Sequence, residues 1–379
     1  MHATATKPKN PLLELLGYGQ SIWYDYIRRG LIASGELERL ITQDGLRGVT
    51  SNPSIWEKAI NGSTDYAEAI ATLRRDGETD PVAIYERLAI QDLREAADAF
   101  RPIYDETERG DGYVSIEVAP EFAHDTKKTI AEGERLWQAI DRENLMVKVP
   151  ATPEGIPAIR ALTARGMNVN ITLLFAVPVY EQVADAYISG LEDFAGGGGD
   201  VSRVASVASF FVSRIDSLVD ARLEEVARLA PTAERRTLAR GLEGKVAIAN
   251  AKLAYQSYKE VVASDRWQAL TKEGAHVQRL LWASTSTKNP RYPELLYVEE
   301  LIGRHTVNTV PPATFEAFWD HGRPRASLED DVEAARDTLA TLAELGISLG
   351  EVTDRLTEDG IELFEKAFDQ LFAAITRST

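Results

Sequence analysis

The chain of 379 residues is 44% hydrophobic, which is enough for a large core, and its 42 basic and 59 acidic residues give a formal net charge of −17. Nucleic acids and anionic membranes attract basic surfaces, so this balance argues against both as partners. Without any cysteine, disulfides, thiol nucleophiles and cysteine-ligated zinc are excluded.

The beginning of the chain lacks the apolar stretch of a secretory signal, and no run approaches the ~18 apolar residues of a membrane span. We therefore expect a cytoplasmic protein. Eight short stretches of apolar, β-branched or alternating residues then follow along the chain: 20–27, 46–53, 112–118, 145–151, 168–174, 204–212, 279–286 and 305–311. Eight strands separated by helical patterns predict an α/β fold, a single (β/α)8 TIM barrel over residues 1–379 with additional helices.

Two helices between these strands have clear amino-terminal signals. Asp125 caps a predicted helix that carries an apolar face to Ile140. After the fourth stretch, Thr152 can cap a helix with Pro153 at its first position, and Gly166 ends the turn that follows.

Three further segments complete the organisation. Residues 216–276 are too long for one crossover helix and predict several helices inserted between strands 6 and 7. Residues 325–379 predict C-terminal helices that pack outside the barrel. The glycine-rich segment 195–200 lacks the Lys-Ser/Thr of a phosphate loop and predicts a flexible turn.

Alternation within three consecutive strands separates apolar from polar side chains. One face of these strands is made of valine, isoleucine and leucine, and the other carries Glu117, Lys148, Asn170 and Thr172 near the carboxyl ends. A barrel places its active site at that end. The alternative is that Glu117 and Lys148 form a structural ion pair, but a buried pair is a poor source of stability, and the polar neighbours favour function.

A buried lysine suits carbonyl chemistry. Desolvation disfavours an ammonium ion and can leave a neutral amine that attacks a carbonyl to form a Schiff base. This reaction needs no metal or other cofactor, and the histidines are scattered without metal-ligand spacing at positions 2, 124, 276, 305 and 321. It does need an acid/base, for which Glu117 and Asp25 are candidates. By itself, Asp25 could equally cap a helix or lie in an exposed loop.

Five ordered motifs together resemble the transaldolase family over most of the chain: GVTSNPSIW, VSIEVAPEFAHDT, LMVKVPATPEGI, NVNITLLF and SFFVSRIDS. The resemblance implies a metal-free, class I barrel enzyme of the pentose phosphate pathway. Such an enzyme moves a dihydroxyacetone unit from sedoheptulose 7-phosphate or fructose 6-phosphate to an aldose phosphate, either glyceraldehyde 3-phosphate or erythrose 4-phosphate. The added helices indicate a longer subgroup.

The resemblance also implies roles for individual residues. Lys148 resembles the Schiff-base lysine, Asp25 the acid/base at the substrate C4 hydroxyl, and Glu117 the glutamate that works through a water held by Thr172. The groups that match binding residues are Asn52, Asn170 and Ser209 for the dihydroxyacetone hydroxyls, Phe211 for an aromatic wall, and Arg214 and Ser284 for the phosphate.

One position departs from the family pattern. Many members have a second phosphate-binding arginine two residues after the serine that matches Ser284, and this chain has Ser286 there. Lys288 or Arg291 could supply the missing charge.

Two other functions remain open. A fructose 6-phosphate aldolase would release dihydroxyacetone, but that branch tends to have an amide at the position of Glu117 and a tyrosine at that of Phe211. A non-catalytic sugar-phosphate-binding barrel would lack a coherent set of acids and bases. The sequence is compatible with a monomer or a homodimer.

Overall fold

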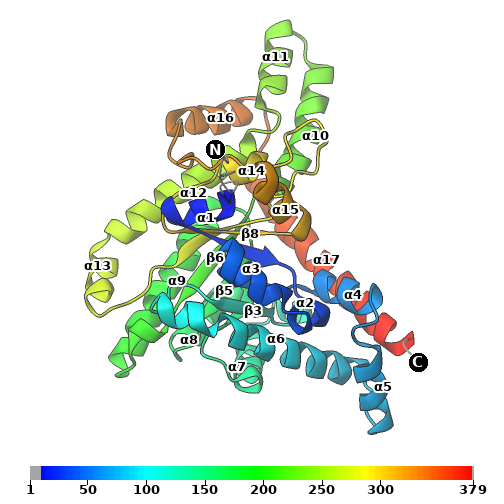
Figure 1. Ribbon diagram of the computed structural model, residues 1–379. Coiled ribbons are helices and arrows are strands. Elements are labelled where there is room, and N and C mark those ends of the chain that lie inside the picture. The colour runs from blue at the N-terminus through cyan, green and yellow to red at the C-terminus, as the bar shows by residue number, and fades with distance from the viewer. Residues whose placement is uncertain (1–9, 378–379) are drawn as a thin grey trace, which may run out of the picture.

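The computed structural model describes residues 10–377, and its eight strands close into one parallel barrel in which neighbours in the chain are neighbours in the ring (Figure 1). Each predicted stretch contains one strand, which confirms the predicted (β/α)8 barrel. The strands are β1 (Gln20–Asp25), β2 (Gly48–Thr50), β3 (Tyr113–Glu117), β4 (Leu145–Pro150), β5 (Val169–Leu174), β6 (Ser206–Phe211), β7 (Arg279–Ala283) and β8 (Thr306–Val310).

Helices surround the barrel between successive strands. Those up to β6 are α1 (Pro11–Gly17), α2 (Arg29–Ala33), α3 (Glu36–Asp44), α4 (Pro53–Asn61), α5 (Ala67–Arg75), α6 (Pro81–Glu106), α7 (Thr126–Ile140), α8 (Gly155–Thr163) and α9 (Val177–Gly196), with short 3-10 turns at Pro120–Phe122 and Val201–Arg203.

Further helices follow β6. Between β6 and β7 lie α10 (Ser213–Leu229), α11 (Ala233–Leu242), α12 (Val246–Ala263) and α13 (Asp265–Lys272). After β7 come α14 (Leu296–Glu299), α15 (Pro312–His321), α16 (Val332–Glu344) and α17 (Leu349–Arg377). In Figure 1, α17 runs beside α4, and it also contacts α6, α10 and β5. This long helix therefore lies against the elements that surround the carboxyl ends of the strands.

The predicted helix starts have different outcomes. Asp125 caps α7 as predicted, because its side chain accepts a hydrogen bond from the backbone N–H of Lys128. The predicted start of α8 is wrong by two residues, since the helix begins at Gly155 and not at Pro153. The Thr152 hydroxyl nevertheless accepts a hydrogen bond of 2.9 Å from the N–H of Gly155, the third residue after it, as a cap does, and Pro153 and Glu154 form the turn between them. The glycine-rich segment forms the predicted turn after α9.

The register of the barrel aligns the polar residues that alternation placed on one face. Glu117 pairs with Lys148, and Lys148 pairs with Asn170 on the next strand. The apolar residues that alternate with them, including Val114, Val147 and Ile171, are fully buried. The strands are therefore buried on both sides, and the three polar side chains lie in one layer.

One residue departs from the regular alternation. The register between β5 and β6 shifts between Ile171 and Leu174, and Leu173 has a positive φ of 53°. A β-branched or bulky residue rarely adopts this conformation outside a turn or bulge. The bulge brings Leu173 beside Gly360 of α17, where a Cβ on the glycine would lie only 2.7 Å from Leu173 Cδ2.

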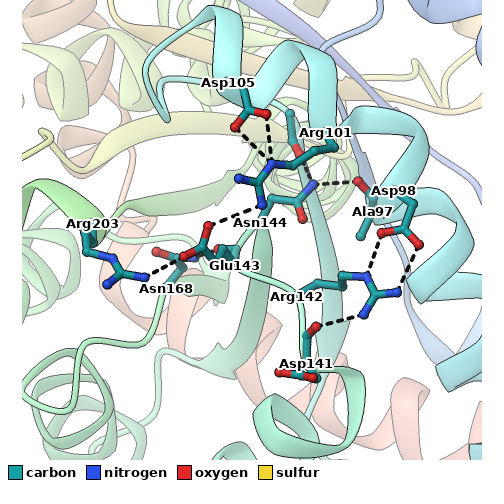
Figure 2. A network of polar contacts seen from close by, with 11 residues as sticks. Ala97, Asp98, Arg101, Asp105, Asp141, Arg142, Glu143, Asn144, Asn168 and Arg203 are labelled. Carbon is teal, nitrogen blue, oxygen red and sulfur yellow. Dashed lines mark hydrogen bonds and ion pairs between the residues drawn. The ribbon is translucent and has the colours of Figure 1, made fainter.

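The amino ends of the strands are joined by a polar network (Figure 2). Asn144 donates to the carbonyls of Ala97 and Gly112, both at 2.8 Å, and thereby ties β4 to α6 and β3. Arg101 and Arg203 both pair with Glu143. Within residues 10–377, no helix is long and apolar enough to cross a membrane.

Candidate active site

A pocket of about 440 Å³ lies at the carboxyl ends of the strands. Ten of the twelve residues predicted for the site line it: Asp25, Asn52, Lys148, Thr172, Ser209, Phe211, Arg214, Ser284, Ser286 and Lys288. The other two lie directly behind this lining, since Glu117 contacts Lys148 and Asn170 contacts Ser209. The structure thus brings together residues that are up to 263 positions apart (288 − 25).

Lys148 projects from β4 into this pocket and is 5% exposed. Its Nζ donates to Glu117 Oε2 at 3.3 Å and to the Ser51 carbonyl at 3.0 Å. Burial raises the pKa of Glu117, and the positive charge of Lys148 opposes this shift. A carboxyl with a raised pKa beside an amine binds a proton more readily than an exposed carboxyl, and it can accept and return one.

Two buried oxygens near this pair have no hydrogen-bond partner among residues 10–377. They are Glu117 Oε1 and Thr172 Oγ1. Buried polar atoms of this kind are usually paired, so unsatisfied ones require an explanation. Glu117 Oε1 and the Thr172 hydroxyl are therefore available as hydrogen-bond partners for a water molecule or a substrate group that exchanges protons with Lys148.

Asp25 ends β1 and faces the pocket. Its Oδ1 accepts a hydrogen bond of 2.7 Å from the Thr50 hydroxyl, which is itself 2.7 Å from the hydroxyl of Thr309. Burial raises the pKa of Asp25, with Lys148 the largest opposing influence. This fixed carboxyl, neither a helix cap nor an exposed loop acid, can act as an acid or a base.

The polar layer between these groups is held by hydrogen bonds across strands. Ser209 donates to Asn170 Oδ1 at 2.6 Å, and Asn170 Nδ2 donates to Ser115 Oγ at 3.1 Å. Asn52 caps α4 through its Oδ1, which accepts from the Ile55 N–H at 3.1 Å, and this orients the side chain at the pocket wall. Such a layer offers amide and hydroxyl groups to a polyhydroxylated ligand.

The other end of the pocket is basic. Arg214 lies over the Phe211 ring, with 5.3 Å between the guanidinium carbon and the ring centroid. Desolvation lowers the pKa of both Arg214 and Lys288. Ser284 has a positive φ of 56° and lies 3.0 Å from the Ser213 hydroxyl, while Lys288 donates to Ser286 Oγ at 2.9 Å.

Arg291 lies elsewhere. It pairs with Glu224 at 2.9 Å and with Glu243 at 3.5 Å, and it does not line the pocket. Of the two cations considered for the missing charge, the structure therefore brings only Lys288 to the site.

The histidines are also dispersed: His276 contacts the Ser202 carbonyl, and residues 10–377 contain no group of histidine, aspartate and glutamate that could hold a metal. His2 lies outside the described residues.

The sequence predictions missed two lining residues of interest, Lys58 on α4 and Phe364 on α17. Lys58 follows Asn52 by six positions, so a helix that starts at the asparagine could have suggested it. Phe364 has no such signal, because only the packing of α17 brings it to the pocket.

The fold and the pocket first define a class: a (β/α)8-barrel enzyme with its reacting groups at the carboxyl ends of the strands. The family model described as Transaldolase/Fructose-6-phosphate aldolase matches residues 22–375. The chain belongs to this family, which confirms the resemblance, and it is a transferase.

Curated relatives match nearly the full length. A protein of Trichodesmium erythraeum named Transaldolase is 47% identical over 97% of both chains. One of Nostoc punctiforme named Transaldolase 2 is 49% identical, and one of Acidothermus cellulolyticus named Transaldolase is 47% identical, again over 97% of each chain.

Proposed function

We propose that this protein is a transaldolase. It transfers a dihydroxyacetone unit from sedoheptulose 7-phosphate or fructose 6-phosphate to glyceraldehyde 3-phosphate or erythrose 4-phosphate. The observation that carries the proposal is the single pocket in which Lys148, paired with Glu117, faces Asp25 and a basic end. The names of the relatives support the same activity.

The proposed reaction begins at Lys148. Its ammonium passes a proton to Glu117, and the neutral amine attacks the ketose C2 carbonyl to give a carbinolamine. Glu117 then returns a proton to the departing hydroxyl, so that water leaves and a Schiff base forms. The unpartnered Thr172 hydroxyl and Glu117 Oε1 support a water between them at this step.

The carbon–carbon bond breaks next. Asp25 takes the proton of the C4 hydroxyl as the C3–C4 bond breaks, and the bond electrons pass into the Schiff base to form an enamine. The aldose phosphate leaves, and an acceptor aldehyde takes its place. The enamine carbon attacks this aldehyde while Asp25 returns the proton, and hydrolysis of the new Schiff base frees the product and Lys148.

The remaining predicted residues bind the substrate in this proposal. Asn52, Asn170 and Ser209 hold the dihydroxyacetone hydroxyls. Phe211 forms a wall, and the phosphate contacts Arg214, Ser284, Ser286 and Lys288 at the basic end. A cytoplasmic location in the pentose phosphate pathway, a monomer or homodimer, and no nucleic acid partner belong to the same proposal.

The test is to trap the Schiff base. The protein is incubated with fructose 6-phosphate and borohydride, with and without erythrose 4-phosphate, and its intact mass and labelled peptide are measured. We expect a reduced dihydroxyacetone adduct on Lys148 that the acceptor diminishes. Lys252 provides an internal control because it is equally buried, at 5% exposure, yet donates to the Asp330 carbonyl outside the pocket.

The other outcomes separate the alternatives. An adduct that forms regardless of acceptor, together with release of dihydroxyacetone, would indicate a fructose 6-phosphate aldolase. Failure to form any adduct would indicate a non-catalytic sugar-phosphate-binding barrel and contradict the proposal.

A further inference from the structure

Three cationic side chains from separate parts of the chain line the same pocket: Lys58 on α4, Arg214 on α10 and Lys288 after β7. Among residues 10–377, none of the three forms an ion pair with a carboxylate. This is unusual in a chain with a net charge of −17, where acidic partners are abundant. A basic pocket in an acidic protein indicates a site built for an anion.

The positive charges of Arg214 and Lys58 both act on Lys288. The pKa of Lys288 is lowered by desolvation first, then by the positive charges of Arg214 and Lys58, and only the nearby carboxyl of Asp25 opposes these effects. Arg214 is in turn influenced by Asp25 and Glu117. Like charges held together raise the free energy of the empty site, and a bound dianion would relieve their repulsion.

Helix α4 directs Lys58 to the pocket. The helix begins after the Asn52 cap, with Pro53 in its first turn, and Lys58 lies in its last turn. Ser54, Ile55 and Lys58 line the pocket because residues three and four positions apart share a helix face. Trp56 lies on the opposite side and is only 1% exposed, and α17 packs along α4 (Figure 1).

We propose that Lys58 is a phosphate-binding residue and that it acts with Lys288 to replace the second arginine, which this chain lacks at Ser286. Arg214 binds the substrate phosphate from the first turn of α10, Lys58 binds it from α4, and Lys288 binds it from the segment after β7. The inference rests on the proposed function, which supplies the phosphate of the donor and acceptor sugars.

The test uses Lys58→Gln and Lys58→Arg, with Lys272→Gln as the matched control. Lys272 is also an exposed lysine in the last turn of a helix, α13, but it does not line the pocket. We expect Lys58→Gln to raise KM for fructose 6-phosphate and Ki for inorganic phosphate by about tenfold, the loss of one charge-assisted hydrogen bond. KM should rise more than kcat falls, and Lys58→Arg should restore most of the binding.

Direct binding of inorganic phosphate, measured by calorimetry, makes this test independent of turnover. If the wild-type protein binds phosphate through Lys58 but transfers no dihydroxyacetone, the proposed function fails and the phosphate site stands. If the wild-type protein is active and Lys58→Gln changes KM, Ki and phosphate affinity no more than Lys272→Gln does, the role of Lys58 is overturned.

Discussion

Lys148 is balanced by one carboxylate, Glu117, and both side chains are more than 90% buried. Removing one partner of a buried ion pair usually destabilises a protein, but burial raises the pKa of Glu117, so this carboxyl can take up a proton and become neutral when the lysine is removed. We expect Lys148→Ala to abolish transfer and borohydride trapping while the protein remains folded. Circular dichroism and thermal melting check the fold, and Lys252→Ala is the control for loss of a buried lysine. A Lys148→Ala variant with full activity would refute the mechanism.

Asp25 lowers the stability of the fold because burial disfavours its charged form. Burial raises its pKa, so the folded state binds the proton more tightly, and stability falls as pH rises from the unfolded pKa of about 3.9 through the folded one. Asp25→Asn removes this cost. We expect a higher Tm than wild type at pH 8, a difference that disappears below pH ~4, and a loss in kcat of about 10²- to 10⁴-fold.

A control for this prediction is Asp337→Asn, which changes an exposed acid on α16. That variant should leave both Tm and kcat as in wild type. Equal melting temperatures of Asp25→Asn and wild type at pH 8 would show that the carboxyl is not destabilising.

At the residue scale, alternation predicted which side chains point inward, because side chains on a strand alternate strictly between its two faces. It placed Glu117, Lys148 and Asn170 in one layer, as the register confirms. It did not predict Lys58 and Phe364, because helix packing brings these two residues to the pocket.

At the element scale, the bulge in β5 and helix α17 form a close contact. Gly360 lies against Leu173, and its added Cβ would be 2.7 Å from Leu173 Cδ2 and 3.6 Å from Arg214 Nη1. We expect Gly360→Val to lower the free energy of unfolding by about 1–3 kcal/mol through overpacking and to raise KM by displacing Arg214. Gly350→Val is the control, because only Ser348 Oγ lies near its added Cβ, at 3.7 Å. Denaturant unfolding and steady-state kinetics measure the two effects. An unchanged KM would show that α17 does not influence phosphate binding.

The sequence predicts the helices and strands well where a local signal exists. It predicts them poorly where contacts between distant segments determine their packing. Eight strands were identified from their apolar and β-branched runs, and Asp125 marked the start of α7. Thr152 makes the contact to the third following N–H that a helix cap makes, but Pro153 and Glu154 form a turn, so α8 begins at Gly155 and not at Pro153. No local signal indicated that α17 would pack along α4, since the two helices are nearly 300 positions apart.

At the scale of the whole molecule, the barrel separates chemistry from structural support. The proposed catalytic groups lie at the carboxyl ends of the strands, whereas the amino ends are closed by polar networks. One network crosses the barrel: Arg279 on β7 donates to Asp111 Oδ1 at 2.8 Å and to the Ser21 hydroxyl at 2.9 Å, and Ser21 donates to Asp111 Oδ2 at 2.6 Å. It joins β1, β7 and the segment before β3, which are not neighbours in the ring.

This separation predicts that stability can be lost without loss of catalysis. Arg279→Met leaves the buried carboxylate of Asp111 without its cation, which should cost about 3 kcal/mol and lower Tm by ~4 °C in a chain of this length. Arg203→Met, at the same end of the barrel, breaks only an exposed pair with Glu143 (Figure 2) and should cost less than about 1 kcal/mol. Assayed well below its Tm, Arg279→Met should retain kcat and KM, because the altered side chain lies at the end of the barrel opposite the pocket. A large fall in kcat while the variant is fully folded would show that the two ends are coupled.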